Sequence, residues 1–356
     1  MKIIVGFSGG IDSTMAACFL REEGHSVIPV TLVFHEENRE ETLWRARTAA
    51  MTAGLDKPIV VDVSDLFQKR VIQSFLSSYE RGWTPNPCIY CNEKVKFNGL
   101  FEVAGQLGCK AVATGHYARM GNGRRSGLFK GIDPRKDQSY MLYRLPQDWY
   151  ETIHFPLGCR TKEEIKLRAE NLFPALKDIT VESTDLCFLA KGRLPDFLEE
   201  NVSNSPGEIV TIDGETIGTH HGLSQYTIGQ RQGLGLSNGP WFVVDKVTTS
   251  NRLVVGRRNN LAVNVVECSD IVLHEDLFAG QVVSMRHRYR TPFVNSEVLS
   301  ISQEKLRILC HEPACGVAPG QSAVLYSGDR IIGGGIIEKT YWRRPSHEAN
   351  TSPSES

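Results

Sequence analysis

The sequence predicts an α/β fold in which an N-terminal, doubly wound parallel-sheet domain precedes a small central β-rich domain and a C-terminal antiparallel β-barrel. Three observations predict it. Runs of β-branched residues alternate with helical patterns through about the first 115 residues, helical periodicity ends near residue 205, and short strand-like runs separated by turn residues follow from about residue 265. With 356 residues, the chain is long enough for two or three domains.

The first domain is expected to alternate strand and helix. Strands are predicted over 3–7, 27–34, 58–63 and 111–114, and helices over 13–23, 39–53, 64–79 and 93–107. Gly54 and Gly108 close two of these helices, where a glycine is favoured. A doubly wound sheet binds its ligand at the carboxyl ends of its strands. The irregular stretches 81–91 and 121–138 are therefore candidate binding loops.

The remainder is predicted to be mostly β-structure. Central strands are expected over 207–210, 241–247 and 252–255, and barrel strands over 271–273, 281–288, 296–301, 305–309, 322–326 and 331–337. These patterns place the domains at 1–204, 205–264 and 265–344. The glycine run 333–335 is expected to kink a barrel strand. The Pro/Ser-rich end, 345–356, has no apolar period and is expected to be a disordered tail.

Charge and cysteine content exclude several classes of protein. The 40 Lys and Arg nearly balance the 41 Asp and Glu, which excludes a uniformly basic nucleic-acid coat and a disordered polyelectrolyte. An RNA partner must therefore use a local patch. The absence of a long apolar run and of a leader-like start predicts a cytoplasmic protein with no membrane partner. Nine cysteines, an odd number, fit reduced thiols better than a secreted disulfide framework.

A glycine-rich turn follows the first predicted strand. In Ser8-Gly9-Gly10-Ile11-Asp12-Ser13, backbone N–H groups and the start of a helix can hold phosphate, and the glycines let the backbone approach it closely. The turn lacks the lysine of an ordinary P-loop and the spacing of a dinucleotide fold. It resembles the PP-loop of ATP pyrophosphatases, which implies cleavage of ATP to AMP and pyrophosphate while a substrate oxygen is adenylated.

Two further segments carry candidate reactive thiols. The proline-stiffened segment 84–92 presents Cys88 and Cys91 just before a helix that carries Lys94 and Lys96, and a helix start and nearby cations lower a thiol pKa. On spacing alone, this pair fits a redox pair, half of a metal site or coincidence, and two further zinc ligands at suitable spacing are not evident. Cys187 lies in ESTDLCF and, taken alone, is typical of a buried packing cysteine.

Two clusters of basic residues are candidate RNA contacts, although either one alone is also typical of a solvated surface. Residues 286–290 alternate cations with a tyrosine, which suits phosphates and an unstacked base. The other cluster comprises Arg119, Arg124, Arg125, Lys130, Arg135 and Lys136.

A set of motifs that runs in order along most of the chain resembles the tRNA-specific 2-thiouridylases of the MnmA type. The motifs are SGGIDS, TPNPCIYCNEKVKF, ATGHYAR, KDQSYML, ESTDLCF, HHGLSQYTIGQRQGLG, APGQSAVLY and GGGII. The resemblance implies an enzyme that replaces the 2-oxo group of the wobble uridine (U34) of tRNA by sulfur. It would use ATP with Mg²⁺ and a persulfide handed over by a sulfur-relay protein, with no DNA partner.

The resemblance also implies roles for individual residues. Cys91 would be the nucleophile and Cys187 the persulfide carrier, and the two would end as a transient disulfide once sulfur has passed to a base that is flipped out of its stack. ATP would be bound by Gly6, Phe7, Ser8, Gly9, Gly10, Ile11, Asp12, Ser13, Leu32 and Gly115. The tRNA would be contacted by Asn86, Pro87, Cys88, His116, Lys136, Asp137, Gln138, Arg288, Tyr289 and Gln321.

One departure from the family pattern leaves the sulfur route open. Many relatives carry an aspartate, thought to act in acid–base chemistry, where this chain has Cys88, and a thiol does not simply replace a carboxylate. Three cysteines (88, 91 and 187) in such a protein also admit an iron–sulfur cluster, as in some other tRNA-thiolating relatives.

Two other functions remain alternatives. An amide-forming ATP pyrophosphatase would need an ammonia source, and it should survive the loss of Cys91 and Cys187. An RNA-binding module with an inactive ATP site would form no AMP in the presence of tRNA.

Overall fold

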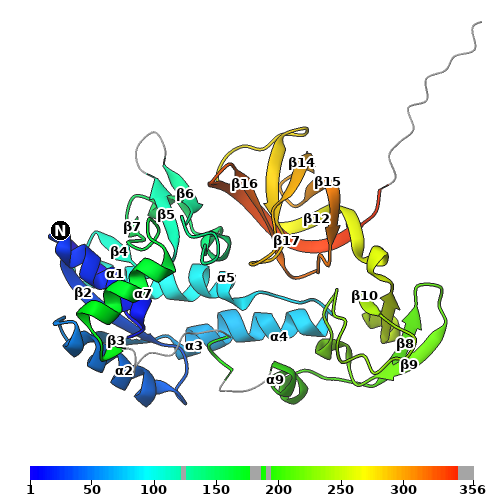
Figure 1. Cartoon of the computed structure of the whole chain (residues 1–356), viewed down its shortest axis with the longest axis horizontal. Helices are drawn as coiled ribbons and strands as arrows, with labels where there is room; N and C mark the ends of the chain where they lie inside the picture. Colours follow the sequence, from blue (N-terminus) through cyan, green and yellow to red (C-terminus); the bar gives the residue numbers. More distant parts are fainter. Residues whose placement is uncertain (122–125, 177–185, 190–193, 344–356) are drawn as a thin grey trace, which may run out of the picture.

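The computed structural model describes residues 1–121, 126–176, 186–189 and 194–343, and it contains three sheets that lie next to one another (Figure 1). The first sheet is parallel, with strand order β3-β2-β1-β4-β7. Its strands are β1 (Lys2–Gly6), β2 (Ser26–Val33), β3 (Ile59–Asp62), β4 (Ala111–Ala113) and β7 (Ile153–His154). The chain adds β2 and β3 on one side of β1 and then β4 and β7 on the other, so the topological switch point lies between β1 and β4.

Helices cover this sheet because β1 is apolar on both faces. Ile3 and Val5 are fully buried with alanines of α1 (Ile11–Glu22) and α2 (Arg39–Thr52), while Ile4 is buried on the opposite side with Leu100 of α6 (Phe97–Gln106). A strand buried on both faces reads as a continuous apolar run, as KIIVG does. Helix α7 (Lys162–Leu172) packs on α1 through Ile165 and Ala169.

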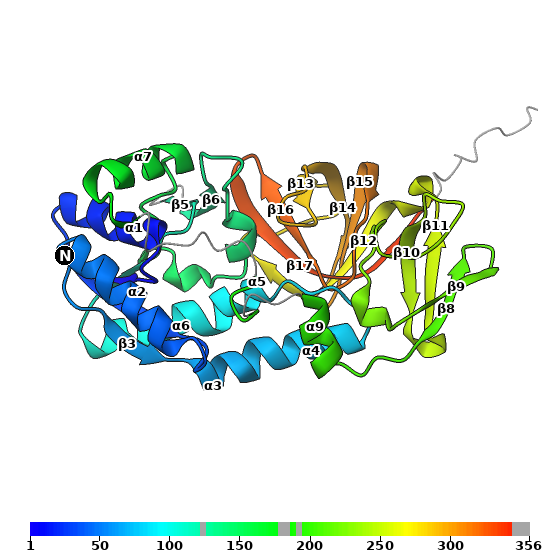
Figure 2. The ribbon, with the colours of Figure 1, turned by 60° about the horizontal axis from the view of Figure 1, so that its bottom comes forward.

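Each of the two long helical segments contains a wider, π-helical turn. The first comprises α3 (Ser64–Phe67), the π turn η1 (Gln68–Ile72) and α4 (Gln73–Glu80), and it extends from the parallel sheet to the central domain (Figure 2). The second comprises α5 (Pro87–Cys91), the π turn η2 (Asn92–Lys96) and α6. The prediction that this second helix begins at residue 93 was wrong. It begins at Pro87, because the side chain of Asn86 caps it and proline suits the first helical position.

The central sheet is mixed. It contains β8 (Gly207–Thr211), β9 (Thr216–His220), β10 (Phe242–Val247) and β11 (Arg252–Gly256) in the order β10-β11-β8-β9, and only β11 and β8 run parallel. Its neighbour α9 (Leu194–Asn201) packs against α4, where Phe75 and Tyr79 meet Leu198 and Val202.

Six antiparallel strands form the C-terminal barrel, which closes where β12 pairs with β17. They are β12 (Ala262–Leu273), β13 (Val282–Arg286), β14 (Val294–Ile301), β15 (Leu306–Cys315), β16 (Ser322–Ser327) and β17 (Arg330–Tyr341). The predicted barrel is therefore confirmed. At Gly334 a Cβ would lie 2.5 Å from the carbonyl oxygen of Ala323, so only glycine permits this close approach of β17 and β16.

The stretch 121–138, predicted to be irregular, instead contains a strand that links the parallel-sheet domain to the barrel. β5 (Ala118–Gly121) and β6 (Gly127–Lys130) form a hairpin, and Phe129 of β6 pairs with Arg330 of β17. The short 3₁₀ turns η4 (Ser139–Leu142), η5 (Gln147–Trp149), η6 (Leu223–Gln225), η7 (Thr248–Ser250) and η8 (Arg258–Leu261) complete the described elements. The expected disordered tail lies outside the described residues. Within the described ranges, no helix has both the length and the apolar character needed to cross a membrane.

Candidate nucleotide and thiol site

The glycine-rich turn predicted to hold phosphate joins β1 to α1 beside the switch point of the sheet. Gly9 has a φ of +74°, and a Cβ there would lie 2.7 Å from the carbonyl oxygen of Arg45. Ser13 braces the turn, because its Oγ accepts from Ser8 N and donates to Gly10 O. Gly10 is the N-cap of α1 and supplies no side-chain cap, so the first N–H groups of the helix remain available to an anion.

The carboxylate of Asp12 lies between two groups from distant parts of the chain. Lys162 Nζ lies 2.8 and 2.9 Å from its two oxygens, and Tyr117 Oη donates to it at 2.8 Å. Gly115, expected at the nucleotide, follows β4, and a Cβ there would lie 2.9 Å from the backbone carbon of Asp12. Leu32, also expected there, is buried near the end of β2. The turn and Gly115 thus flank the switch point, where a doubly wound sheet holds its ligand.

Sequence reasoning missed Lys162. The glycine-rich turn lacked a lysine of its own, and Lys162 supplies that charge from the start of α7, where the Thr161 capping box begins the helix. The capping signal Thr161-x-x-Glu164 could have placed Lys162 at a helix start. No local pattern, however, indicated that this helix begins next to Asp12, 150 residues earlier in the chain.

The structure places Cys88 and Cys91 in the one-turn helix α5, and Cys187 close enough to affect the titration of Cys91. Cys91 is 8% exposed, Cys88 is partly buried and Cys187 is exposed, and all nine cysteines are free thiols. The exposed surface of Cys187 does not fit the role of a buried packing cysteine, and its role as persulfide carrier stays a prediction.

Burial dominates the protonation of the three thiols. It raises the pKa of Cys91 to about 12, and the neighbouring Cys187 and Cys88 add to this rise, whereas the charge of Lys96 opposes it. Although the surface of Cys187 is exposed, the protein around it raises its pKa to about 11, again against the charge of Lys96. Burial also raises the pKa of Cys88, and the charge of Lys96 opposes this rise without cancelling it. All three are thus protonated at neutral pH in this state, so the expected thiolate reactivity needs an event that stabilises negative charge.

The barrel supports the segment that precedes the thiol helix. Thr84 N donates to Pro319 O at 2.8 Å, Gln321 Nε2 donates to Thr84 O at 2.6 Å, and a Cβ on Gly320 would lie 2.9 Å from Thr84 N. Asn86 uses its Oδ1 to accept from Cys88 N and its Nδ2 to contact the sulfur of Met141. The backbone of 84–88 is therefore held from both sides, with Pro87 buried and Cys88 partly accessible.

A second contact joins the barrel to the thiol helix through Tyr90, which lies between the two cysteines. Tyr90 Oη donates to Asp270 of β12 at 2.8 Å. Arg144 binds the same Asp270 through its Nη2 at 3.0 Å and Glu93 through its Nε. Asp270 has a φ of +45°, a strained conformation that these contacts hold in place.

The residues expected to contact tRNA lie around this junction, but their side chains are not equally available. Asp137 is buried, where it pairs with Arg286 at 3.1 Å and accepts from Gly131 N and Ser139 N, so its carboxylate joins the hairpin to the barrel. Gln138 Oε1 accepts from Tyr117 N. Arg288 donates to Ile228 O of the central domain, and Tyr289 is partly exposed beside it.

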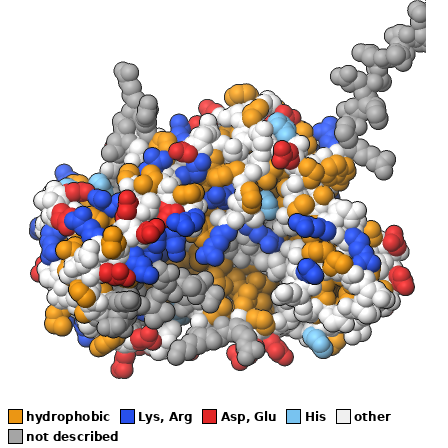
Figure 3. Space-filling view, viewed as in Figure 1, with side chains coloured by type: hydrophobic (Ala, Val, Ile, Leu, Met, Phe, Trp, Pro, Cys, Tyr) orange, Lys and Arg blue, Asp and Glu red, His pale blue; other side chains and the backbone are white. Residues whose placement is uncertain are grey.

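The two basic clusters are only partly open to solvent. Arg119 and Lys130 pair with Asp329, Arg286 is buried, and Arg124 and Arg125 lie outside the described residues. Arg135 and Arg290 are exposed. Figure 3 shows Lys and Arg side chains gathered around the middle of one face, beside an apolar area between the parallel-sheet domain and the other two domains.

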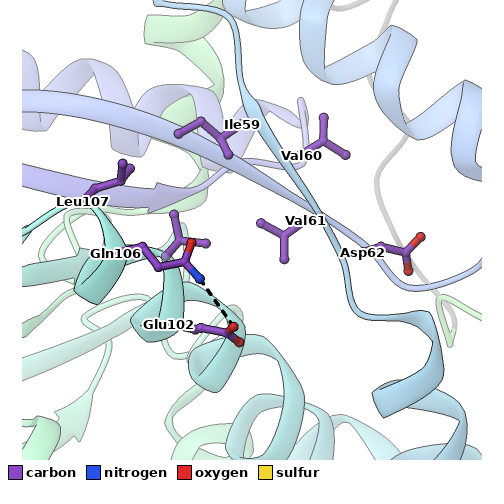
Figure 4. Close-up of a pocket in the computed structure, with 8 residues that line it drawn as sticks. Ile59, Val60, Val61, Asp62, Glu102, Gln106 and Leu107 are labelled. Carbon is purple, nitrogen blue, oxygen red and sulfur yellow. Dashed lines mark hydrogen bonds between the residues drawn. The ribbon is translucent and has the colours of Figure 1, made fainter.

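Two features of the described residues carry no site chemistry. No three His, Cys, Asp or Glu side chains in the described ranges are grouped so that they could hold a metal ion. A cavity of about 330 Å³ lies between the edge strand β3 and α6, lined by residues such as Val61, Glu102 and Leu107 (Figure 4). Its walls are apolar or carboxylate and amide side chains, and none of the candidate residues lines it.

Comparisons with known proteins cover nearly the whole chain. The family models that match are described as a tRNA methyl transferase HUP domain (residues 1–191), a tRNA methyl transferase PRC-barrel domain (195–257) and an aminomethyltransferase beta-barrel domain (270–337). The chain is 38% identical over 349 residues to a tRNA-specific 2-thiouridylase MnmA of Gloeothece citriformis, covering 95% of this chain and 99% of the relative. It is 39% identical over 347 residues to the protein of the same name from Dehalococcoides mccartyi, covering 94% and 96%.

Proposed function

Since this chain belongs to the tRNA-specific 2-thiouridylase family, we propose that its site replaces the C2 oxygen of the wobble uridine of tRNA by sulfur in two stages. ATP first adenylates the uracil oxygen at the turn between β1 and α1, and sulfur carried by a cysteine then displaces AMP. The observation that carries this proposal is the placement of Cys88, Cys91 and Cys187 as mutually interacting thiols in a chain that also holds an uncapped glycine-rich turn.

The turn and Lys162 are proposed to bind the triphosphate. The N–H groups at the start of α1 and the α1 dipole attract the phosphates, and Lys162 adds a positive charge next to Asp12. Mg²⁺ would arrive bound to ATP, and Asp12 would supply the nearby carboxylate. When bound, the ion would neutralise phosphate charge. The stretch Gly6–Ser13, with Leu32 and Gly115, would surround the nucleotide, as the family resemblance implies.

The sulfur step is proposed to use two cysteines in different roles. Uracil C2 is a poor electrophile until its oxygen is adenylated, and the terminal sulfur of a persulfide on Cys187 can then attack this carbon as AMP leaves. The exposed position of Cys187 supports its role as the carrier, because a persulfide donor must reach it. Cys91, which is buried beside it, then attacks the Cys187 sulfur and releases the thiolated base, leaving a Cys91–Cys187 disulfide.

The tRNA is proposed to lie over the junction of the three domains. The segment 86–88 would face the flipped base, and His116, Lys136, Gln138, Arg288, Tyr289 and Gln321 would surround it. Gln321 and Arg288 support this placement because they link the barrel to the thiol segment and to the central domain. The buried carboxylate of Asp137 would act by holding these parts together. A sulfur-relay protein is the proposed source of the persulfide.

The test is the reaction itself. Unmodified tRNA would be incubated with the protein, MgATP and a persulfide donor, and its nucleosides would be analysed by mass spectrometry while AMP is quantified. We expect 2-thiouridine and AMP in equal amounts. Folded protein that forms neither product with a competent donor would contradict the proposal, and AMP without 2-thiouridine would contradict its sulfur stage. An amide-forming enzyme would form AMP without tRNA when given its own acid and ammonia.

A further inference from the structure

Lys96 occupies a position that the helix geometry makes unusual. It lies five positions after Cys91, and in an α-helix residues five positions apart point about 140° away from each other. Residues 92–96 form a π-helical turn instead, whose hydrogen bonds join residues five apart, so Cys91 and Lys96 lie one above the other on the same side. The π turn thus brings the lysine to the side of the helix that carries the thiol.

The ammonium of Lys96 is held by a neutral histidine. Its Nζ lies 3.5 Å from His116 Nε2, and His116 Nδ1 lies 2.7 Å from Thr114 Oγ1. Since an ammonium group only donates, Nε2 accepts and Nδ1 carries the proton that it donates to Thr114. Burial and the charge of Lys96 lower the pKa of His116 well below its usual range, which keeps this ring neutral.

No carboxylate in the described part of the chain lies within ion-pair distance of Lys96. The nearest one in sequence, Glu93 of the same turn, is bound by Arg144 at 2.5 Å and by Lys94 at 2.5 Å. The titratable groups that interact with Lys96 are instead the three thiols and His116. The lysine is therefore a partly buried cation whose described electrostatic neighbours become negative only when a thiol loses its proton.

We propose that Lys96 is a positioning residue for the sulfur-transfer step, which holds its charge against the thiols so that Cys91 can react as a thiolate. This inference rests on the function proposed above and extends it to a residue outside the cysteines and the nucleotide turn. His116 fixes the ammonium without neutralising it, which a carboxylate partner would do. His116 directly follows Gly115, which lies against the backbone of Asp12. The contact between Lys96 and His116 therefore connects the thiol helix to the nucleotide turn.

The step in which the charge matters is the resolution of the adduct. Cys91 loses its proton to water, and its sulfur attacks the Cys187 sulfur of the Cys187–S–S–C2 adduct. The Cys91–Cys187 S–S bond forms as the other S–S bond breaks, and the electron pair leaves with the sulfur on C2 as 2-thiouracil. The two cysteines are oxidised by two electrons and the transferred sulfur is reduced by two. A thiol reductant and a new persulfide then restore the starting state.

The test measures thiol titration directly, without tRNA or ATP. The rates at which Cys88, Cys91 and Cys187 react with a small thiosulfonate reagent would be followed from pH 7 to 10.5 by peptide mass spectrometry. We expect Lys96→Met to slow all three thiols about tenfold at pH 8 and to move their pH profiles up by about one unit, because each pKa unit changes the thiolate fraction tenfold. Lys96→Arg should keep most of the wild-type profile, because it keeps the charge.

Two controls separate charge from structure. Lys94→Met removes an exposed lysine of the same turn that already pairs with Glu93, and its profiles should match the wild type. In every variant, the exposed Cys159 and Cys315 should react at unchanged rates. A Lys96→Met variant with normal far-UV circular dichroism and unshifted profiles for all three thiols would overturn the inference. So would equal slowing by Lys96→Met and Lys96→Arg, because that pattern reports packing.

The result is separable from the proposed function. If the wild type makes no 2-thiouridine, the function fails whatever Lys96 does. If the wild type is active and the profiles do not move, only the role of Lys96 fails. With both correct, Lys96→Met should still release one AMP per enzyme in its first turnover with tRNA, while steady formation of 2-thiouridine falls about tenfold and recovers as the pH is raised.

Discussion

Lys162 Nζ lies 2.8 Å from Asp12 Oδ1, although 150 residues separate the two in the chain. The pair joins the first turn of α7 to the first turn of α1, directly beside the glycine-rich turn. An ordinary P-loop takes its lysine from the loop itself. Here the charge comes from a helix that packs across α1, so the phosphate site is complete only when the domain has folded.

The first prediction follows from this pair. Lys162→Met should raise the KM for ATP in AMP formation by roughly 10- to 100-fold, because a hydrogen bond to a charged group contributes about 1.5–3 kcal/mol. The measurement is AMP release in the presence of tRNA at several ATP concentrations. Lys166→Met, which removes an exposed lysine one turn further along α7, is the matched control and should behave as the wild type. An unchanged KM in Lys162→Met would remove Lys162 from the nucleotide site.

The second prediction compares two adjacent glycines. Gly9→Ala should abolish ATP binding, because its φ of +74° is strained for alanine and the new Cβ would lie 2.7 Å from backbone oxygen. Gly10→Ala has a φ of −76° and its nearest contact is Ser8 Oγ at 3.4 Å, so it should fold and bind. Isothermal titration with a nonhydrolysable ATP analogue distinguishes the two. Equal binding by both variants would show that the turn is not shaped by Gly9.

The third prediction concerns the cysteines. Cys91→Ser and Cys187→Ser should each abolish turnover to 2-thiouridine while one round of pyrophosphate release with tRNA continues, because adenylation releases pyrophosphate and precedes sulfur transfer. Cys159→Ser, at an exposed cysteine outside the thiol group, should remain fully active. Nucleoside mass spectrometry and pyrophosphate assays on the same samples give both readouts. Sustained turnover to 2-thiouridine in either serine variant would disprove the two-cysteine route, and loss with Cys88→Ser alone would favour a role for Cys88.

The fourth prediction is a loss of stability in acid. Burial, with a smaller effect of Arg288, lowers the pKa of His287 from 6.5 to about 4, so between these values the unfolded chain binds a proton that the folded chain does not. Stability therefore falls as the pH drops from about 6.5 to 4, by at most about 3 kcal/mol from this residue. His287→Gln should flatten the pH dependence of the thermal midpoint in this range. An equally steep dependence in the variant would assign the acid sensitivity to other groups.

The sequence was most informative where structure is local. The alternating apolar runs predicted the parallel sheet, and turn residues at short intervals predicted the barrel. The start of the thiol helix was missed because the prolines of TPNPC suggest an extended loop, whereas Asn86 and Pro87 together form an N-terminal cap. The strand β6 was missed because its pairing with β17 joins segments about 200 residues apart.

In the candidate site, too, features encoded by neighbouring residues were predicted and features that depend on distant contacts were not. The glycine-rich turn and the cysteines were found from short motifs, whose chemistry depends on neighbours in sequence. Lys162 was not assigned a role, because that role depends on the packing of α7 on α1, and Lys96 could not be separated from Lys94 as the cation at the thiols, because that depends on the register of a π turn. Neither arrangement leaves a local pattern. Likewise, the resemblance placed Asp137 among the tRNA contacts, and no local pattern indicated that its buried carboxylate pairs with Arg286 of the barrel.

The most direct test of the central claim follows the oxygen that leaves the base. Transfer RNA carrying ¹⁸O at C2 of the wobble uridine would be thiolated in ordinary water, and the AMP would be analysed by mass spectrometry. Adenylation of the uracil oxygen predicts one ¹⁸O atom in the phosphate of AMP for every 2-thiouridine formed. Formation of 2-thiouridine with AMP that carries no ¹⁸O would contradict it, because ATP would then not have activated the base.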